Sequence, residues 1–141
     1  MIHRIRKKMH CTLKICPPVG SEELNALFAS AWPDHHAFDF RPILEHALAY
    51  VCAYEGGRLV GFVKIVGDGG IHGFLLDPTV APDRRRNGIG TQLVKACAEE
   101  AGRRGVQWLH VDYEPHLKKF YSSCGFSPTE AGLLNLKKEV S

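Results

Sequence analysis

The chain has 141 residues, of which 45% are hydrophobic and 23% charged, so it is long enough to bury a core and too apolar to stay disordered. Its formal net charge of +3 is too small to indicate nucleic-acid binding by itself, and no apolar run approaches the roughly 20 residues that cross a bilayer. The five cysteines are odd in number and no pair has metal-ligand spacing, which predicts reduced thiols, no metal site and a cytoplasmic location.

Regular spacing of apolar residues predicts the elements of the first half of the chain. Residues 1–8 are basic without a following apolar run, and we expect a frayed surface arm rather than a nucleic-acid contact. Alternating apolar residues predict strands, and apolar residues at every third or fourth position predict helices. Because tight, glycine-containing turns join the last three strands, we expect these strands to form an antiparallel meander. The predicted strands are residues 11–19, 49–54, 59–66 and 71–76, and the predicted helices are residues 21–32 and 42–48.

The second half of the chain predicts further helices and strands. An amphipathic helix ends at Gly102 or Gly105, and residues 106–111 are predicted to form the next strand. Since a helix connects this strand to residues 71–76, we expect the two strands to be parallel. The remaining predicted elements are a short helix over residues 117–123 and a terminal hairpin over residues 126–140, within a single α/β domain of residues 1–141.

Residues 79–91 are the most informative stretch of the chain. Strand-like sequence runs into three arginines, an asparagine and the glycines Gly88 and Gly90, and the amphipathic helix follows. The free amides and the positive dipole end of such a helix N-terminus suit a phosphate, and Arg85 and Arg86 can supply fork-shaped donors. The alternative is that the glycines only allow close helix packing and that the arginines are solvated. The run lacks the third glycine of a dinucleotide fingerprint and the Gly-Lys-Ser/Thr of a P-loop.

Two neighbouring features favour the phosphate interpretation. Pro78 lies near the end of a strand predicted to be central, where it cannot donate a ladder hydrogen bond, so we expect the strand to diverge from a neighbour there. Phe120-Tyr121 lies on the short helix after the following parallel strand, and the ends of parallel strands face the same way. Tyr121 is therefore expected to approach the ligand.

The run Val80-Ala-Pro-Asp-Arg-Arg85-Arg-Asn-Gly88-Ile-Gly90 resembles the acyl-CoA signature of the GNAT N-acetyltransferases, a Gln/Arg-x-x-Gly-x-Gly/Ala sequence between the fourth strand and the third helix. The run Leu117-Lys-Lys-Phe120-Tyr121-Ser-Ser-Cys124-Gly125-Phe126 is similar to the second signature of that family. The resemblance covers nearly the whole chain and implies an α/β (α+β) fold: a mixed, mostly antiparallel twisted sheet of about six to seven strands with about four helices on both faces. It also implies acetyl-CoA as co-substrate and an amine acceptor, with a monomer or a homodimer left open.

Carried over by position, the resemblance implies roles for individual residues. The amides from Arg86 to Thr91 would hold the CoA pyrophosphate, and the backbone of Thr79 and Val80 would pair with the pantetheine arm. Tyr121 would lie near the thioester sulfur. Many members have Asn where this chain has Glu114, so no contact from Glu114 to CoA is expected. The expected cofactor-binding residues are Thr79, Val80, Arg85, Arg86, Asn87, Gly88, Ile89, Gly90 and Thr91.

Acetyl transfer to an amine needs a polarised thioester carbonyl, a proton for the departing thiolate and a neutral amine. A backbone N–H near Val80 can polarise the carbonyl. Tyr121 is predicted to be the general acid, because a phenol of pKa about 10 can protonate a thiolate whose thiol pKa is about 8.5. Asp77 is predicted to be the base, with His72, His110 or water as alternatives.

The acceptor is expected on the opposite side of the diverging strands, next to the first helix and the loop after it. Aromatic and acidic residues in that loop suit a cationic amine, and a wet surface loop explains them equally well. The predicted function is an N-acetyltransferase that moves an acetyl group from acetyl-CoA to a primary amine of a small molecule or peptide. The alternative is a non-catalytic acyl-CoA-binding regulatory module. The loop residues concerned are Trp32, Asp34, His35, His36 and Phe38.

Overall fold

The computed structural model describes residues 11–137, so the basic arm predicted at residues 1–8 lies outside the described residues. The chain forms two compact units, which meet in the sequence between Val111 and Asp112 and are described separately. The first unit contains β1 (Thr12–Ile15), α1 (Ser21–Ala31), α2 (Arg41–His46), β2 (Ala49–Glu55), β3 (Arg58–Gly67), β4 (His72–Val80), the 3-10 turn η1 (Pro82–Arg84), α3 (Ile89–Arg103) and β5 (Trp108–His110). The second unit contains the 3-10 turn η2 (Pro115–Leu117) and α4 (Lys118–Ser123).

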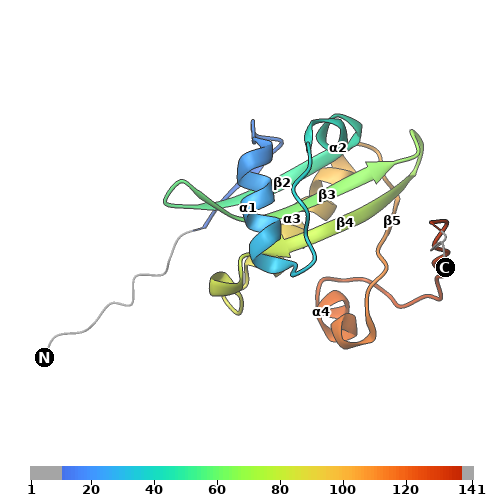
Figure 1. Ribbon diagram of the computed structural model, residues 1–141. Coiled ribbons are helices and arrows are strands. Elements are labelled where there is room, and N and C mark those ends of the chain that lie inside the picture. The colour runs from blue at the N-terminus through green and yellow to red at the C-terminus, as the bar shows by residue number, and fades with distance from the viewer. Residues whose placement is uncertain (1–10, 138–141) are drawn as a thin grey trace, which may run out of the picture. The chain divides into compact units, whose positions relative to one another are not determined.

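The strands of the first unit form one sheet in the order β1-β2-β3-β4-β5 (Figure 1). The first three pairings are antiparallel, which confirms the predicted meander. The β2–β3 turn contains Gly56 and Gly57, whose positive φ angles of 56° and 80° suit a tight hairpin. The β4–β5 pairing is parallel, as predicted, because α3 carries the chain back across the sheet before β5 begins.

Two neighbouring residues of β3 show that α1 and α3 cover opposite faces of the sheet. A Cβ atom on Gly61 would lie 2.7 Å from Leu93 Cδ1 on α3, so this side of the strand faces α3. The Phe62 ring lies 5.9 Å from the Phe28 ring of α1 in an edge-on contact, and it points the other way because side chains alternate along a strand. In Figure 1, α1 lies in front of the strands and α3 behind them. The predicted helices on both faces of a mixed sheet are therefore confirmed.

Several predicted boundaries differ from the structure, including that of β5, which spans Trp108–His110 rather than residues 106–111. The first strand ends at Ile15, not within residues 16–19, because Cys16 takes a φ of 48° and turns the chain away from the sheet. The second helix ends at His46, since Leu48 already donates its amide to Ile65 of β3 at 2.8 Å. The strand predicted over residues 71–76 continues to Val80.

The sheet has five strands within residues 11–137, so the predicted count of six to seven is wrong. The missing part is the terminal hairpin predicted over residues 126–140, of which residues 126–137 contain no strand. The apolar residues of this segment include Leu133 and Leu134 in succession, and a strand cannot turn two successive side chains to one face. Both side chains are more than 80% exposed. The hairpin was thus predicted from hydrophobic residues that lack the alternation typical of a strand.

Across the described residues, we find no helix with both the length and the apolar character needed to cross a membrane.

Candidate functional site

The register between β3 and β4 slips by one residue in the second half of β4. Phe62 pairs with Thr79, but Lys64 pairs with Leu76, so β4 holds one residue more than β3 between these two pairs. Asp77 takes up the extra length with a left-handed φ of 56°, and Pro78 has no amide hydrogen to donate. This β-bulge agrees with the divergence expected at Pro78.

Beyond the bulge, the edge of β4 that faces β5 has no strand beside it within the first unit. The parallel pairing with β5 covers only residues 72–74 of β4, opposite residues 108–110. On the other edge, Ala81 donates its amide to Val60 of β3 at 2.8 Å. Because successive amides of a strand point to opposite edges, the Val80 N–H points to the open edge. A backbone donor therefore faces the space where β5 no longer pairs.

The chain then turns into α3 through a short segment that has two residues in the left-handed region. Arg86 has a φ of 68° and Gly88, the N-cap of α3, has a φ of 77°. No side chain caps this helix N-terminus, so the amides of its first turn have no side-chain acceptor. Successive amides in such a turn form a concave anion-binding surface, which the positive end of a 15-residue helix reinforces.

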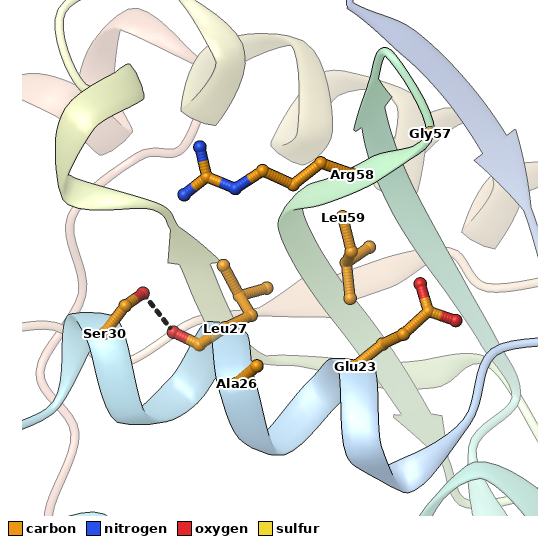
Figure 2. Close-up of a pocket in the computed structure, with 7 residues that line it drawn as sticks. All are labelled: Glu23, Ala26, Leu27, Ser30, Gly57, Arg58 and Leu59. Carbon is orange, nitrogen blue, oxygen red and sulfur yellow. Dashed lines mark hydrogen bonds between the residues drawn. The ribbon is translucent and has the colours of Figure 1, made fainter.

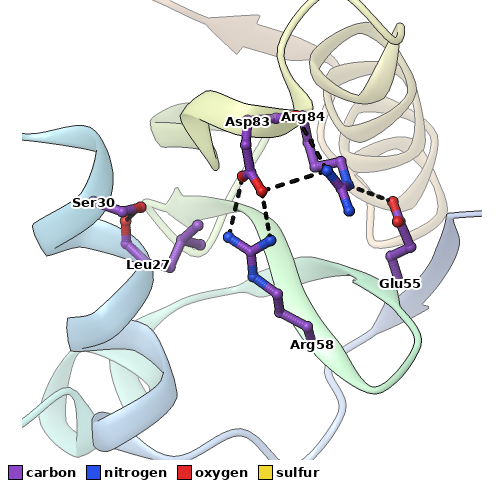
Figure 3. A network of polar contacts seen from close by, with 6 residues as sticks. All are labelled: Leu27, Ser30, Glu55, Arg58, Asp83 and Arg84. Atoms are coloured by element: carbon purple, nitrogen blue, oxygen red, sulfur yellow. Dashed lines mark hydrogen bonds and ion pairs between the residues drawn. The ribbon is translucent and has the colours of Figure 1, made fainter.

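The three successive arginines of this segment have different environments. The Arg84 guanidinium is mostly buried and donates its Nε hydrogen to Glu55 Oε2 at 2.8 Å (Figure 3). Arg85 and Arg86 are exposed, and neither takes part in an ion pair with any residue in the described part of the chain. The guanidinium groups of these two arginines, which can each donate two parallel hydrogen bonds to a phosphate, thus remain available beside the amides of the α3 N-terminus.

On the α1 face of the bulge, the structure brings together Trp32, Thr79, Asp77 and Lys64. Trp32 Nε1 donates to Thr79 Oγ1 at 3.2 Å, and Thr79 Oγ1 donates to the Asp77 carbonyl at 3.0 Å. The Asp77 carboxylate is half exposed and lies 3.0 Å from Lys64 Nζ. Lys64 is two residues beyond Phe62 on β3, which places this ion pair on the face that α1 covers. The sequence contained no signal for Lys64, because the contact depends on the register of β3 against β4.

The two candidate histidines also lie together on this face. His72 Nδ1 and His110 Nε2 are 2.9 Å apart, and the Phe74 ring stacks on His110 at 4.6 Å. Gly73, between His72 and Phe74, faces the other side, because a Cβ there would meet Val106 at 3.1 Å. The imidazole pair therefore stands at the last pairing of β4 with β5, just before the open edge.

The loop after α1 is held by Asn25 rather than left free. Asn25 Nδ2 donates to the Phe38 carbonyl at 2.8 Å, and Asn25 Oδ1 accepts from the Phe38 amide at 3.1 Å. The same oxygen lies 2.8 Å from His35 Nε2, and the His35 ring packs on Phe28 and Phe40. His35 is thus part of the packed loop, whereas the Trp32 and Phe38 rings are about half exposed.

A small hollow of about 260 Å³ lies between α1 and the β2–β3 turn (Figure 2). Its lining combines the apolar side chains of Ala26, Leu27 and Leu59 with the charged side chains of Glu23 and Arg58. None of the residues predicted for the site lines it, and we assign it no ligand.

In the second unit, Tyr121 lies within an aromatic cluster. Its side chain is 3% exposed and stacks on Tyr113, with Phe120 and Phe126 packed edge-on. Burial raises the pKa of Tyr121 to about 12, with smaller contributions from Cys124 and Asp112. The phenol therefore keeps its proton at neutral and moderately alkaline pH. Gly125, with a φ of 98°, follows the end of α4.

The comparison with known proteins decides the family. Residues 19–126 match the sequence profile of the Acetyltransferase (GNAT) family. The chain belongs to this family. It is similar to a GNAT family acetyltransferase from Streptococcus pneumoniae TIGR4, with a TM-score of 0.74 and 26% identity over 91% of this chain and 100% of that one. It also resembles the aminoglycoside N-acetyltransferase AAC(6')-Iy in complex with CoA, with a TM-score of 0.71 and 22% identity over 92% of this chain and 95% of that one.

A curated relative, the mycothiol acetyltransferase of Nocardia farcinica, is 35% identical over 66 residues. These residues make up 47% of this chain and 22% of that enzyme, so the match spans about a fifth of the relative. The expected resemblance to the GNAT family is confirmed. The roles of the individual site residues stay predictions.

Proposed function

We propose that the chain is an acetyltransferase that moves the acetyl group of acetyl-CoA to a primary amine of a small molecule or peptide. The observation that carries the proposal is the continuous backbone from the β4 bulge to the uncapped N-terminus of α3. It presents the Val80 N–H at an open strand edge and ends in a concave turn flanked by two exposed arginines. An extended pantetheine arm and a pyrophosphate fit these two features in that order.

In this proposal the residues present suit CoA in chemistry as well as in sequence. The amides from Arg86 to Thr91 bind the pyrophosphate, and Arg85 and Arg86 supply cationic forks for phosphate oxygens. Along the open edge the Val80 carbonyl accepts from an amide of the pantetheine arm, whereas the Thr79 N–H and C=O point to β3, so Thr79 does not pair with CoA through its backbone. The related aminoglycoside acetyltransferase has been solved in complex with CoA and with a CoA-containing bisubstrate analogue, which supports this choice of ligand.

The reaction is a direct attack of the amine nitrogen on the thioester carbonyl. The Val80 N–H stabilises the oxyanion as the C–N bond forms, and collapse of the tetrahedral intermediate breaks the C–S bond. Tyr121 protonates the departing thiolate, and because burial raises its pKa to about 12 the phenol carries its proton at neutral pH before the transfer. The base accepts the proton that the amine loses, so the products are the acetylated amine and CoA.

We assign the role of base to Asp77, because its half-exposed carboxylate stands at the bulge on the α1 face. His110 is the competing group on the same face. Asp77→Asn is expected to lower kcat/KM strongly, whereas His110→Gln is expected to leave it close to the wild-type value. A strong loss in His110→Gln together with little loss in Asp77→Asn would move the assignment to the imidazole pair.

The decisive test of the function is CoA release from acetyl-CoA with a panel of amines. Small cationic amines, amino sugars and peptides with a free amino group cover the acceptor classes proposed. Turnover with at least one amine, lost in Tyr121→Phe while CoA still binds, supports the enzyme. Binding of CoA without turnover across the panel would indicate a regulatory module instead, and absence of CoA binding would reject both.

A further inference from the structure

Four charged side chains tie the β2–β3 hairpin to the turn η1 (Figure 3). Arg84 Nε lies 2.8 Å from Glu55 Oε2, across 29 positions of the sequence. Arg58 donates two hydrogen bonds to the Asp83 carboxylate, at 2.8 and 3.1 Å. Arg84 Nη1 closes the network with a longer contact of 3.4 Å to Asp83. We call this set of four side chains the anchor network.

The pair of Glu55 and Arg84 is not an ordinary surface ion pair. Their side chains are 17% and 23% exposed, whereas Arg58 and Asp83 are about half exposed. Exposed pairs contribute little because water screens them, but removing one partner of a mostly buried pair leaves the other charge poorly solvated. Within the network, the ion pair between Glu55 at the end of β2 and Arg84 in η1 is therefore the one whose loss costs most stability.

The anchor network lies directly before the part of the chain that needs support. Arg84 precedes the segment from Arg85 to Gly88, in which Arg86 and Gly88 hold left-handed φ angles. A residue other than glycine persists in this region only where its surroundings fix the backbone. No side chain caps the α3 N-terminus, and the network at η1 attaches this turn to the sheet through side chains, beside the backbone hydrogen bond from Ala81 to Val60.

The charges of the network cancel, which distinguishes Arg84 from the next two arginines. Two guanidinium groups face two carboxylates. The hydrogen bonds from Arg58 lower the pKa of Asp83, and the hydrogen bond to Glu55 raises the pKa of Arg84, so both groups stay charged. Arg85 and Arg86 are left as the exposed cations of the segment.

We propose that Glu55 and Arg84 are positioning residues that hold η1 so that the following turn is preorganised for the pyrophosphate of CoA. Arg84 acts through Glu55 and does not contact CoA itself. The choice of ligand rests on the proposed function, but the anchoring of the turn does not.

The first experiment measures CoA binding by calorimetric titration. Glu55→Gln is expected to raise the Kd for CoA about tenfold, while kcat at saturating acetyl-CoA stays within about twofold. Arg84→Gln and the double variant are expected to lose no more than Glu55→Gln alone, since both act through one contact. Glu100→Gln is the matched control: it removes an equally buried carboxylate that pairs with Arg103 and Arg104 near the far end of α3.

The second experiment tests the anchor without CoA. Amide hydrogen exchange of a peptide covering residues 82–92 is expected to be faster in ligand-free Glu55→Gln than in the wild type, and unchanged in Glu100→Gln. Exchanging the charges, with Glu55→Arg and Arg84→Glu together, is expected to recover slow exchange at least partly. This swap also keeps the proposal testable if Glu55→Gln does not fold.

Unchanged exchange and unchanged Kd in Glu55→Gln would overturn the proposal. A larger loss of affinity in Arg84→Gln than in Glu55→Gln would also overturn it, because Arg84 would then contact CoA directly. Faster exchange in Glu55→Gln, with no CoA binding by the wild type, would support the anchor and reject the proposed function.

Discussion

Replacing Gly88 with alanine separates the cost of a left-handed backbone from the cost of blocking a ligand. Gly88 has a φ of 77°, and a Cβ atom built on it meets nothing within 4 Å. The substitution therefore causes no clash in the ligand-free protein. Its cost is the strain of an L residue in the left-handed region, about 1–2 kcal/mol of unfolding free energy. If the Cβ also prevents one amide from reaching a phosphate, the loss of a charge-assisted hydrogen bond adds about 1.5–3 kcal/mol to the binding free energy. That corresponds to roughly a tenfold to hundredfold rise in the Kd for CoA.

Gly69→Ala is the matched control for this prediction. Gly69 lies in the β3–β4 turn with a φ of 83°, and a Cβ there also meets nothing within 4 Å. Urea unfolding is expected to show a similar loss of stability in both variants, whereas calorimetric titration shows weaker CoA binding only in Gly88→Ala. Equal affinities in the two variants would refute the assignment of the pyrophosphate to this turn. A much larger loss of stability in Gly88→Ala would mean that the turn is needed for folding rather than for the ligand.

Three further predictions rest on packing and burial. Tyr121→Phe is expected to lower kcat about 100-fold with little change in CoA affinity, and a loss of kcat under threefold would remove the role of Tyr121 as the acid. Because burial raises the pKa of Tyr121 to about 12, the wild-type kcat is expected to show no alkaline decline from this group below about pH 10. Burial also raises the pKa values of Cys52 and Cys97 from 9.0 to about 12, so both thiols are expected to resist alkylation at pH 8 in the folded protein. Because the unfolded chain loses these protons at lower pH than the folded protein, their contribution to the free energy of unfolding is complete below pH 9 and is lost as the pH rises to about 12. Urea unfolding measured between pH 7 and 11 checks this sign. Gly61→Ala places a Cβ 2.7 Å from Leu93 Cδ1 and is expected to cost about 1–3 kcal/mol in urea unfolding, and a cost below 0.5 kcal/mol would mean that α3 shifts freely on the sheet.

Much of the fold could be predicted because its elements carry local signals. The hairpin joining β2 and β3 follows from its two glycines, and the parallel pairing of β5 follows from the helix that precedes it. The helix after Gly88 was predicted from its apolar spacing, and its boundaries in the structure are Ile89–Arg103. These features depend on backbone conformations and periodicities that each segment prefers by itself.

The terminal segment shows where such signals are insufficient. A terminal hairpin was predicted over residues 126–140, which include Leu133, Leu134 and Leu136, but residues 126–137 form no strand. Apolar composition favours burial without choosing a partner surface, and only alternation specifies a strand face.

The site divides in the same way. The sequence by itself determined the turn from residue 79 to residue 91, because glycine, proline and arginine at these spacings set local backbone geometry and charge. Only the tertiary structure decided which side chains meet there: Lys64 with Asp77, His72 with His110, and Glu55 with Arg84. Each of these pairs joins residues at least 13 positions apart, and their meeting depends on strand register and on the bulge in β4. Register is set by the packing of the whole sheet between α1 and α3, which no local pattern of residues encodes.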